Sequence, residues 1–263
     1  MLALDLCDTH LVTPEWVAAV KADGCRMVIL NAWFGNRSAP DVERALRYIR
    51  EGGLITAVYY VPHAFRPAAY HLQRVREAVG DEWEHLGEGL APDKACVWID
   101  VEEVSNDPPR AQWNMPHILT SRRLVEEGGK VPGIYTNRPA WCAGGPEWLG
   151  ETCSDLALWV ADYNGDPTID LRYPFGGWTA ADAKQYLGTT DVHGINCDLS
   201  TFPDAWLAAQ ASQAGQEAAL EPSPDEVAVL HARWAEAASL RAQADAIEAE
   251  VIAEKVRLGL QPA

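Results

Sequence analysis

The sequence predicts an α/β fold: an irregular, TIM-like (β/α) barrel with few helices between its last strands, followed by a long C-terminal α-helix. Through the first two thirds of the chain, short apolar runs alternate with amphipathic segments, the pattern of parallel strands joined by helices. Beyond Trp178 the strand-like runs follow one another with little helix between them. After residue 221 the composition becomes rich in Ala, Glu and Leu, which predicts the separate helix.

Eight strands are predicted. They are short runs rich in β-branched and aromatic residues, and the first six are apolar enough to be buried on both faces. The strands are expected at Leu2–Leu6, Arg26–Trp33, Leu54–Val61, Cys96–Asp100, Val131–Thr136, Leu156–Tyr163, Ala183–Leu187 and Gly194–Leu199.

Helices are predicted between the early strands. Thr13 is the expected N-cap of the first helix, with Pro14 at its first position and Gly24 at its end. Ser38 or Asp41 is expected to cap the second helix. Two later helices are expected at Pro67–Val79 and Pro116–Glu127.

The C-terminal part is predicted to be separate from the barrel. Residues 1–210 are expected to form the barrel, residues 211–224 a linker, and residues 225–260 an amphipathic helix. The linker prediction depends on the EPSP stretch, and the helix prediction on apolar residues spaced three and four apart after it. Such an apolar face suits docking on the barrel and self-association equally, so both hypotheses stay open.

Charge and composition exclude several classes of function. The 263 residues carry a formal net charge of −17, which opposes binding to nucleic-acid backbones or anionic membranes. No apolar run approaches the roughly 18 residues of a membrane span, and the N-terminus is not typical of a signal peptide. The six cysteines lack metal-ligand spacing, so no metal or cofactor is predicted; a pairing of Cys142 with Cys153 stays open.

Two carboxylates follow the fourth predicted strand. Asp100 and Glu102 are two residues apart, so on a strand they point to the same side, with Cβ atoms roughly 6.5–7 Å apart. Carboxyl groups this close cannot both ionise freely, and one pKa is expected to rise. Glycoside cleavage needs a carboxylic acid that stays protonated near neutral pH. The sequence therefore predicts a sugar-cleaving site, the alternative being that the acids only begin a polar loop.

Further acids and aromatic residues end the other strands. In a (β/α) barrel the working groups collect at the C-terminal ends of the strands. Asp5 ends the first strand, Asp162 the sixth and Asp198 the last. Tyrosine faces and hydroxyls suit pyranose rings. The expected substrate-binding tyrosines are Tyr59, Tyr60, Tyr135 and Tyr163.

The chain resembles the glycoside hydrolase family 25 lysozymes (N-acetylmuramidases), which are common as phage endolysins. The resemblance covers residues 1 to about 207 and depends on the order of LDLCD, AVYY, WIDVE, GIYTN, LWVADYN and GINCDLSTF. The Asp-x-Glu of the fourth strand, between two outer aspartates, is its most specific part. The late Trp-Gln-Tyr pattern of the family is Lys184-Gln185-Tyr186 here, with one aromatic residue lost.

The resemblance implies a barrel that hydrolyses the β-1,4 bond between N-acetylmuramic acid and N-acetylglucosamine in peptidoglycan. It implies that Glu102 is the general acid and that Asp100 is its partner. The outer carboxylates Asp5 and Asp198 would tune this pair and bind substrate. Participation of the substrate's own acetamido group is implied, so no protein nucleophile is assigned.

Two alternatives remain at this stage. One is a non-catalytic barrel that binds glycan or assembles into a phage particle, with the C-terminal helix as its contact to a virion or to a second copy. The other is a related hydrolase that acts on a different glycan. For the enzyme, we expect synthesis in the cytoplasm without a signal peptide and action at the cell wall, after holin-type release or from a virion.

Overall fold

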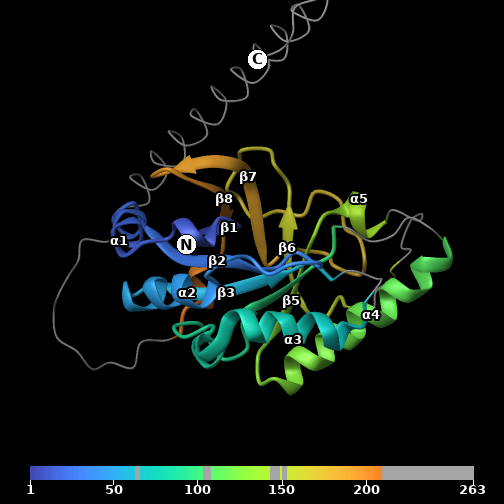
Figure 1. Ribbon diagram of the computed structural model, residues 1–263. Coiled ribbons are helices and arrows are strands. Elements are labelled where there is room, and N and C mark those ends of the chain that lie inside the picture. Colours follow the sequence, from blue (N-terminus) through green and yellow to red (C-terminus); the bar gives the residue numbers. More distant parts are fainter. Residues whose placement is uncertain (63–65, 103–107, 143–148, 150–152, 209–263) are drawn as a thin grey trace, which may run out of the picture.

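The computed structural model describes residues 1–62, 66–102, 108–142, 149 and 153–208 (Figure 1). The predicted linker, 211–224, and the predicted C-terminal helix, 225–260, lie outside the described residues.

Eight strands close into a single barrel in sequence order. From β1 to β7, each strand runs parallel to the next one in the chain. Strand β8 closes the barrel between β7 and β1 and runs antiparallel to both. The predicted irregular barrel is therefore confirmed. The strands are β1 (Leu2–Leu6), β2 (Cys25–Trp33), β3 (Ile55–Tyr60), β4 (Val97–Asp100), β5 (Pro132–Thr136), β6 (Ala157–Ala161), β7 (Ala183–Val192) and β8 (Ile195–Thr201).

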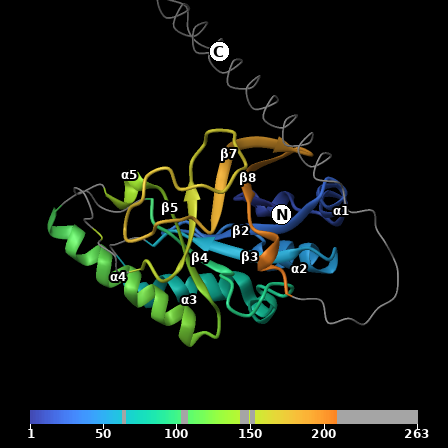
Figure 2. The same ribbon diagram turned by 180° about the vertical axis from the view of Figure 1, so that it is seen from behind.

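The last two strands form a hairpin that is longer than predicted. It turns at His193 and Gly194, which both have positive φ (51° and 84°). In both views the hairpin lies on the side of the barrel opposite α3 and α4 (Figures 1 and 2). Because β8 returns antiparallel beside β1, Asp5 and Asp198 stand directly opposite one another in register.

Helices cover the outside of the barrel between the early strands. The Thr13 hydroxyl accepts a hydrogen bond from the Trp16 backbone N–H at 3.2 Å, which confirms the predicted N-cap. The described part of the chain contains no helix long and apolar enough to cross a membrane. The α-helices are α1 (Pro14–Ala22), α2 (Val42–Glu51), α3 (Ala68–Val79), α4 (Pro108–Glu127) and α5 (Arg138–Trp141).

Helix α4 begins before the predicted start at Pro116, which lies inside it. The prediction used the preference of proline for the first helical position. A proline in the interior removes one backbone hydrogen bond, a local cost that burial of one helix face offsets. That face buries Ile118, Ser121 and Val125.

Aromatic side chains fill the barrel below the strand ends. Trp98 contacts Trp159 and Phe202 edge-on and stacks on Trp206, with ring centroids 5.4–6.0 Å apart. Gly133 leaves room for this cluster, because a Cβ at that position would lie 2.4 Å from the Trp98 ring. The cluster makes a rigid floor for the polar side chains above it.

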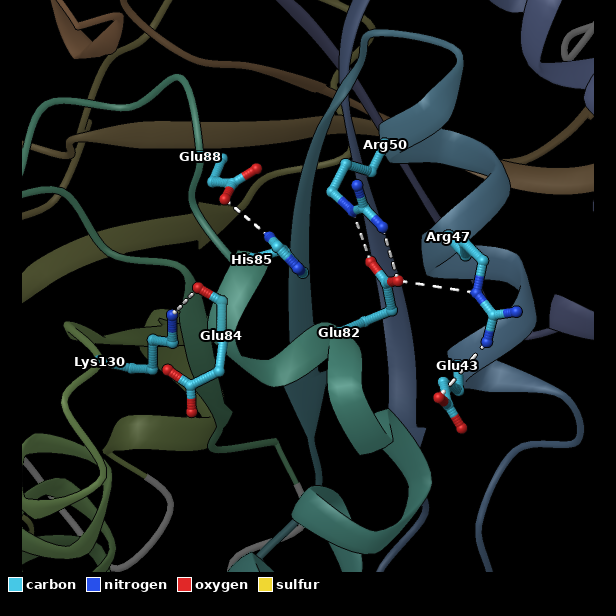
Figure 3. Close-up of polar contacts among 8 residues, drawn as sticks. All are labelled: Glu43, Arg47, Arg50, Glu82, Glu84, His85, Glu88 and Lys130. Atoms are coloured by element: carbon cyan, nitrogen blue, oxygen red, sulfur yellow. Dashed lines mark hydrogen bonds and ion pairs between the residues drawn. The ribbon is translucent and has the colours of Figure 1, made fainter.

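Ion pairs outside the barrel fasten α2 to the 3-10 helix η2 (Gly80–His85). Arg50 donates two hydrogen bonds to the Glu82 carboxylate, at 2.7 and 2.8 Å, and Arg47 approaches the same carboxylate at 3.7 Å (Figure 3). The hydrogen bonds from Arg50 lower the pKa of Glu82. Glu82 is buried, so its negative charge depends on these two guanidinium groups.

All six cysteines are free thiols, and Cys142 and Cys153 do not pair.

Candidate active site

Four predicted acids lie at the end of the barrel where the parallel strands finish. Asp5 comes from β1 and Asp198 from β8, while Asp100 ends β4 and Glu102 follows two residues later. Asp5 and Asp100 are buried, Asp198 is half-buried and Glu102 is exposed. The charges of Asp198, Asp100 and Glu102 all act on Asp5, so the four acids form one electrostatic group.

The side-chain amide of Gln185, on β7, joins the two outer aspartates. Its Nε2 donates to both carboxylate oxygens of Asp5, at 2.9 Å each, and lies 3.3 Å from Oδ2 of Asp198. The other oxygen of Asp198, Oδ1, accepts a hydrogen bond from the Thr189 backbone N–H at 2.6 Å. Both carboxyl groups are therefore held around a single amide nitrogen.

The pKa values of Asp5 and Asp198 both rise in this environment. Burial raises the pKa of Asp5 well above its ordinary value, and the neighbouring charge of Asp198 raises it further. Burial also raises the pKa of Asp198, against the hydrogen bond from Thr189. Among the described residues, neither Asp5 nor Asp198 forms an ion pair with a basic side chain; the hydrogen-bond donors to them are neutral. Such a pair favours holding a proton.

Glu102 is held from β5 and α5. The Asn137 amide donates through Nδ2 to Oε1 of Glu102 at 2.9 Å, while its Oδ1 accepts the Ala140 backbone N–H as the N-cap of α5. The capping bond fixes the amide, and the amide in turn orients the carboxylate. Glu102 is thus both exposed to solvent and restrained.

Three of the four predicted tyrosines lie beside the acids. The hydroxyls of Tyr135 and Tyr163 both donate to Oε1 of Gln185 at 2.6 Å, and lie 3.1 Å apart. The Tyr59 hydroxyl contacts the Cys7 thiol at 3.0 Å. Burial raises the pKa of Tyr59, of Tyr135 and of Tyr163, so their hydroxyls keep their protons.

Tyr60 and Asp162 lie away from this group. Tyr60 follows Tyr59 on the same strand and is fully buried; its hydroxyl lies toward Ser121 of α4, on the outside of the barrel, and makes no hydrogen bond among the described residues. Asp162 lies 3.8 Å from Nζ of Lys184 and 3.7 Å from Nε of Arg172. A substrate contact of Tyr60 is therefore not part of the arrangement that the structure brings together.

Gln185 and Asn137 are polar residues of the site to which sequence reasoning gave no role, although Asn137 was expected at the end of the fifth strand. The signal for Gln185 was a polar residue between Lys184 and Tyr186 within a predicted strand, where side chains alternate between the two faces. The signal for Asn137 was its place before Arg138-Pro139, which suits an N-cap.

Among the described residues, no three His, Cys, Asp or Glu side chains are placed to hold a metal ion. A hollow of about 540 Å³ lies between α3 and α4, on the outer surface of the barrel. Its lining includes Arg76, Glu77 and Glu127 but none of the acids at the strand ends.

The family model described as Lysozyme-like protein 1 matches residues 3–186. A probable GH family 25 lysozyme 3 of Dictyostelium discoideum is 32% identical over 122 residues, which are 45% of this chain and 25% of that protein. Counting factor 50 of the same organism is 30% identical over 110 residues, 40% of this chain and 35% of that protein. The chain thus spans well under half the length of these two relatives. The predicted resemblance to family 25 lysozymes is confirmed.

Solved structures share the fold. A muramidase from Acremonium alcalophilum matches with a TM-score of 0.59 and 16% identity, over 88% of this chain and 99% of that one. The catalytic domain of endolysin ply40 from bacteriophage P40 of Listeria monocytogenes matches with a TM-score of 0.51 and 17% identity, over 88% and 97%. At identities this low, the matches establish the barrel fold.

Proposed function

The chain belongs to the Lysozyme-like protein 1 family, and from this premise we propose that it is a glycoside hydrolase that cleaves peptidoglycan as a muramidase. The observation that carries the proposal is the group of four acids at the strand ends, where Asp5 and Asp198 are hydrogen-bonded by an amide and a backbone N–H in place of a cation. An ion-paired group of acids would instead favour a structural role.

Glu102 is the proposed general acid for cleavage of the β-1,4 bond between N-acetylmuramic acid and N-acetylglucosamine. It is exposed, so it can reach a bound glycan, and the Asn137 amide restrains it. In the proposed reaction its proton moves to the glycosidic oxygen as the bond to the sugar carbon breaks and the oxygen of the substrate's own acetamido group bonds to that carbon. Water then displaces the acetamido oxygen and returns a proton to Glu102.

Asp100 is the proposed partner of Glu102. It is buried at the end of β4, two residues before Glu102. As a carboxylate it stabilises the positive charge that develops on the sugar ring. Asp5 and Asp198 tune the acidity of this pair, and Tyr59, Tyr135 and Tyr163 line the binding site.

Release of reducing sugar ends from purified peptidoglycan tests this proposal. We expect wild-type protein to release them and Glu102→Gln to be slower by about 10²–10⁴-fold, the usual contribution of a general acid. Glu88→Gln is the matched control, because Glu88 is exposed and contacts His85. Wild-type rates in Glu102→Gln, or no release by wild-type protein from several wall types, would contradict the proposal.

The finer proposal is an endolysin that is made in the cytoplasm and reaches the wall after holin-type release. The likeness to a phage endolysin catalytic domain supports it. We expect bacteria that express the chain to lyse only after their inner membrane is permeabilised. Lysis without permeabilisation would contradict this route.

A second candidate function is a barrel that binds glycan, or a virion component, without cleaving glycan. It is favoured by relatives that are named counting factors and not lysozymes. Cosedimentation with insoluble peptidoglycan, unchanged in Glu102→Gln and without release of reducing ends, would support it.

A further inference from the structure

Gln185 connects the two aspartates of the candidate site to two of its tyrosines. It is almost completely buried on β7, paired in register with Ala161 on β6 and with Ser200 on β8. Its side chain makes hydrogen bonds to two acids through Nε2 and to two tyrosines through Oε1.

The hydrogen bonds fix the orientation of the amide. The two N–H groups of Nε2 face Asp5 and Asp198, which accept, and the two lone pairs of Oε1 face the hydroxyls of Tyr135 and Tyr163, which donate. All hydrogen-bonding capacity of the amide is used. A glutamate here would repel the acids, and an apolar side chain would leave all four groups without this partner.

The two tyrosines are oriented as a consequence. Each phenol has one proton, and its hydroxyl lies 2.6 Å from Oε1 of Gln185 and 3.1 Å from the other hydroxyl, so both protons stay within this group of three oxygens. Their oxygens therefore offer lone pairs to a ligand. Tyr163 is 55% exposed, so its oxygen can accept an N–H or O–H of a sugar.

We infer that Gln185 is a positioning residue for this site: its amide holds Asp5 and Asp198 together on one side and turns the oxygens of Tyr135 and Tyr163 into hydrogen-bond acceptors for the glycan on the other. The inference deepens the proposed function and rests on it for the identity of the ligand. Its structural part, the effect on the two aspartates, can be measured without substrate.

The electrostatic consequence has a defined sign. The hydrogen bond from Gln185 lowers the pKa of Asp5, against burial and the neighbouring acids, which raise it. Removing the amide therefore raises the pKa of the pair further. The titratable groups that face Gln185 and its partners are Asp5, Cys7, Tyr59, Asp100, Glu102, Tyr135, Tyr163 and Asp198.

Because the charges of Asp100 and Glu102 act on Asp5, a change in the proton affinity of Asp5 acts back on them. The pH dependence of cleavage is thus expected to move with the titration of the aspartate pair. A residue that only filled space would change stability without moving this profile.

Carbon-13 titration of the Asp5 and Asp198 carboxyl groups tests the inference in the full-length protein. We expect Gln185→Met to raise the upper apparent pKa of the pair by about one unit, the size of one lost charge-assisted hydrogen bond. Gln185→Glu, which is isosteric, is expected to raise it as well. Gln73→Met is the control, since Gln73 is exposed on α3 and its amide donates to Glu77.

The pH profile of reducing-end release from peptidoglycan is measured on the same proteins. We expect it to move toward higher pH in both Gln185 variants, with a fall of about 10-fold or more in kcat/KM. Carboxyl titrations that stay unchanged in Gln185→Glu and Gln185→Met would overturn the positioning role. Wild-type protein that releases no reducing ends would overturn the proposed function instead, so the two failures are distinguishable.

Discussion

Asp5 and Glu82 each have only 4% of their surface exposed, yet their pKa values move in opposite directions. Glu82 lies outside the barrel against the guanidinium groups of Arg50 and Arg47. Asp5 lies inside the barrel end, against Asp198 and the neutral amide of Gln185. A low exposed fraction alone therefore does not distinguish a structural carboxylate from one suited to chemistry; the depth of burial and the charge of the partner do.

Lys184 is a buried cation that, like Glu82, is paired with a side chain of opposite charge. Its side chain is fully buried, and Nζ lies 2.6 Å from Oδ1 of Asp170 and 3.1 Å from the Thr168 carbonyl oxygen. It is adjacent to Gln185 in sequence, but the alternation of a strand turns the two side chains to opposite faces. Lys184 therefore binds the segment that follows β6 and does not pair with the acids at the barrel end.

The largest expected effect in this comparison is a loss of activity on changing an acid at the barrel end. Asp100→Asn is expected to slow release of reducing ends by about 10²–10³-fold, the usual cost of one lost electrostatic stabiliser. Because the change is isosteric, the melting temperature should stay near that of wild type. Kinetics on purified peptidoglycan, with calorimetry on the same samples, provide the check. Wild-type kinetics in this variant would remove Asp100 from the site.

The converse change is Glu82→Gln, which we expect to reduce the free energy of unfolding by about 1–3 kcal/mol while activity is retained. This loss is smaller than that expected for a completely buried ion pair, because Arg50 is 30% exposed and water can solvate it. Urea denaturation measures the loss. A loss of activity in the folded variant would contradict the separation of the two regions.

The two carboxylates should also give opposite pH dependences of stability. Asp5 has a folded pKa above its ordinary 3.8, so its stabilising contribution is present below that pH and is lost as pH rises through the folded pKa. Glu82 has a folded pKa below 4.5, so its contribution is present above that pH and is lost as pH falls through the folded pKa.

Asp198→Asn sharpens this contrast, because it removes the like charge that raises the pKa of Asp5. We expect stability to fall less with rising pH in this variant than in wild type. Urea denaturation across pH 4–8 measures the slopes. Parallel slopes in the two proteins would show that Asp5 and Asp198 do not interact as described.

The smallest expected effect concerns Cys7, beside the acids. Burial raises the pKa of its thiol, and the charges of Asp5 and Asp198 add to the rise. We expect slow reaction with iodoacetamide at pH 7, since the thiolate is the reactive form. Cys7→Ala should change activity by less than about threefold, because the thiol contributes one weak hydrogen-bonding contact, to the Tyr59 hydroxyl. Rapid labelling, followed by mass spectrometry, would contradict the acid-rich environment.

The barrel was predictable because its strands are short apolar runs with clear breaks. The positions of Asp5, Asp100 and Glu102 at one end followed from the rule for parallel strands. Asp198 does not follow from that rule, because β8 is antiparallel and Asp198 lies in its middle, opposite Asp5. This direct opposition depends on the antiparallel return of β8, which a run of apolar residues does not specify.

Neighbouring tyrosines show where sequence reasoning stops. Tyr59 and Tyr60 follow one another on β3, so they must point to opposite faces. One of them must face the barrel interior, but the alternation does not say which one. The register that pairs Tyr59 with Trp98 places Tyr59 on the interior side. Likewise, the partner of Glu82 is Arg50, 32 residues away on another element, so its structural role was not visible in the sequence.

Carbon-13 titration of Asp5, Asp198 and Glu82 in one wild-type sample tests the central claim most directly. The contrast between an acid pair without a cation and a cation-paired acid predicts midpoints for the aspartate pair above the ordinary 3.8, and a Glu82 midpoint below 4.5. Aspartate midpoints at or below 3.8 would show that the barrel end stabilises charged carboxylates as well as Arg50 does, and would contradict the account.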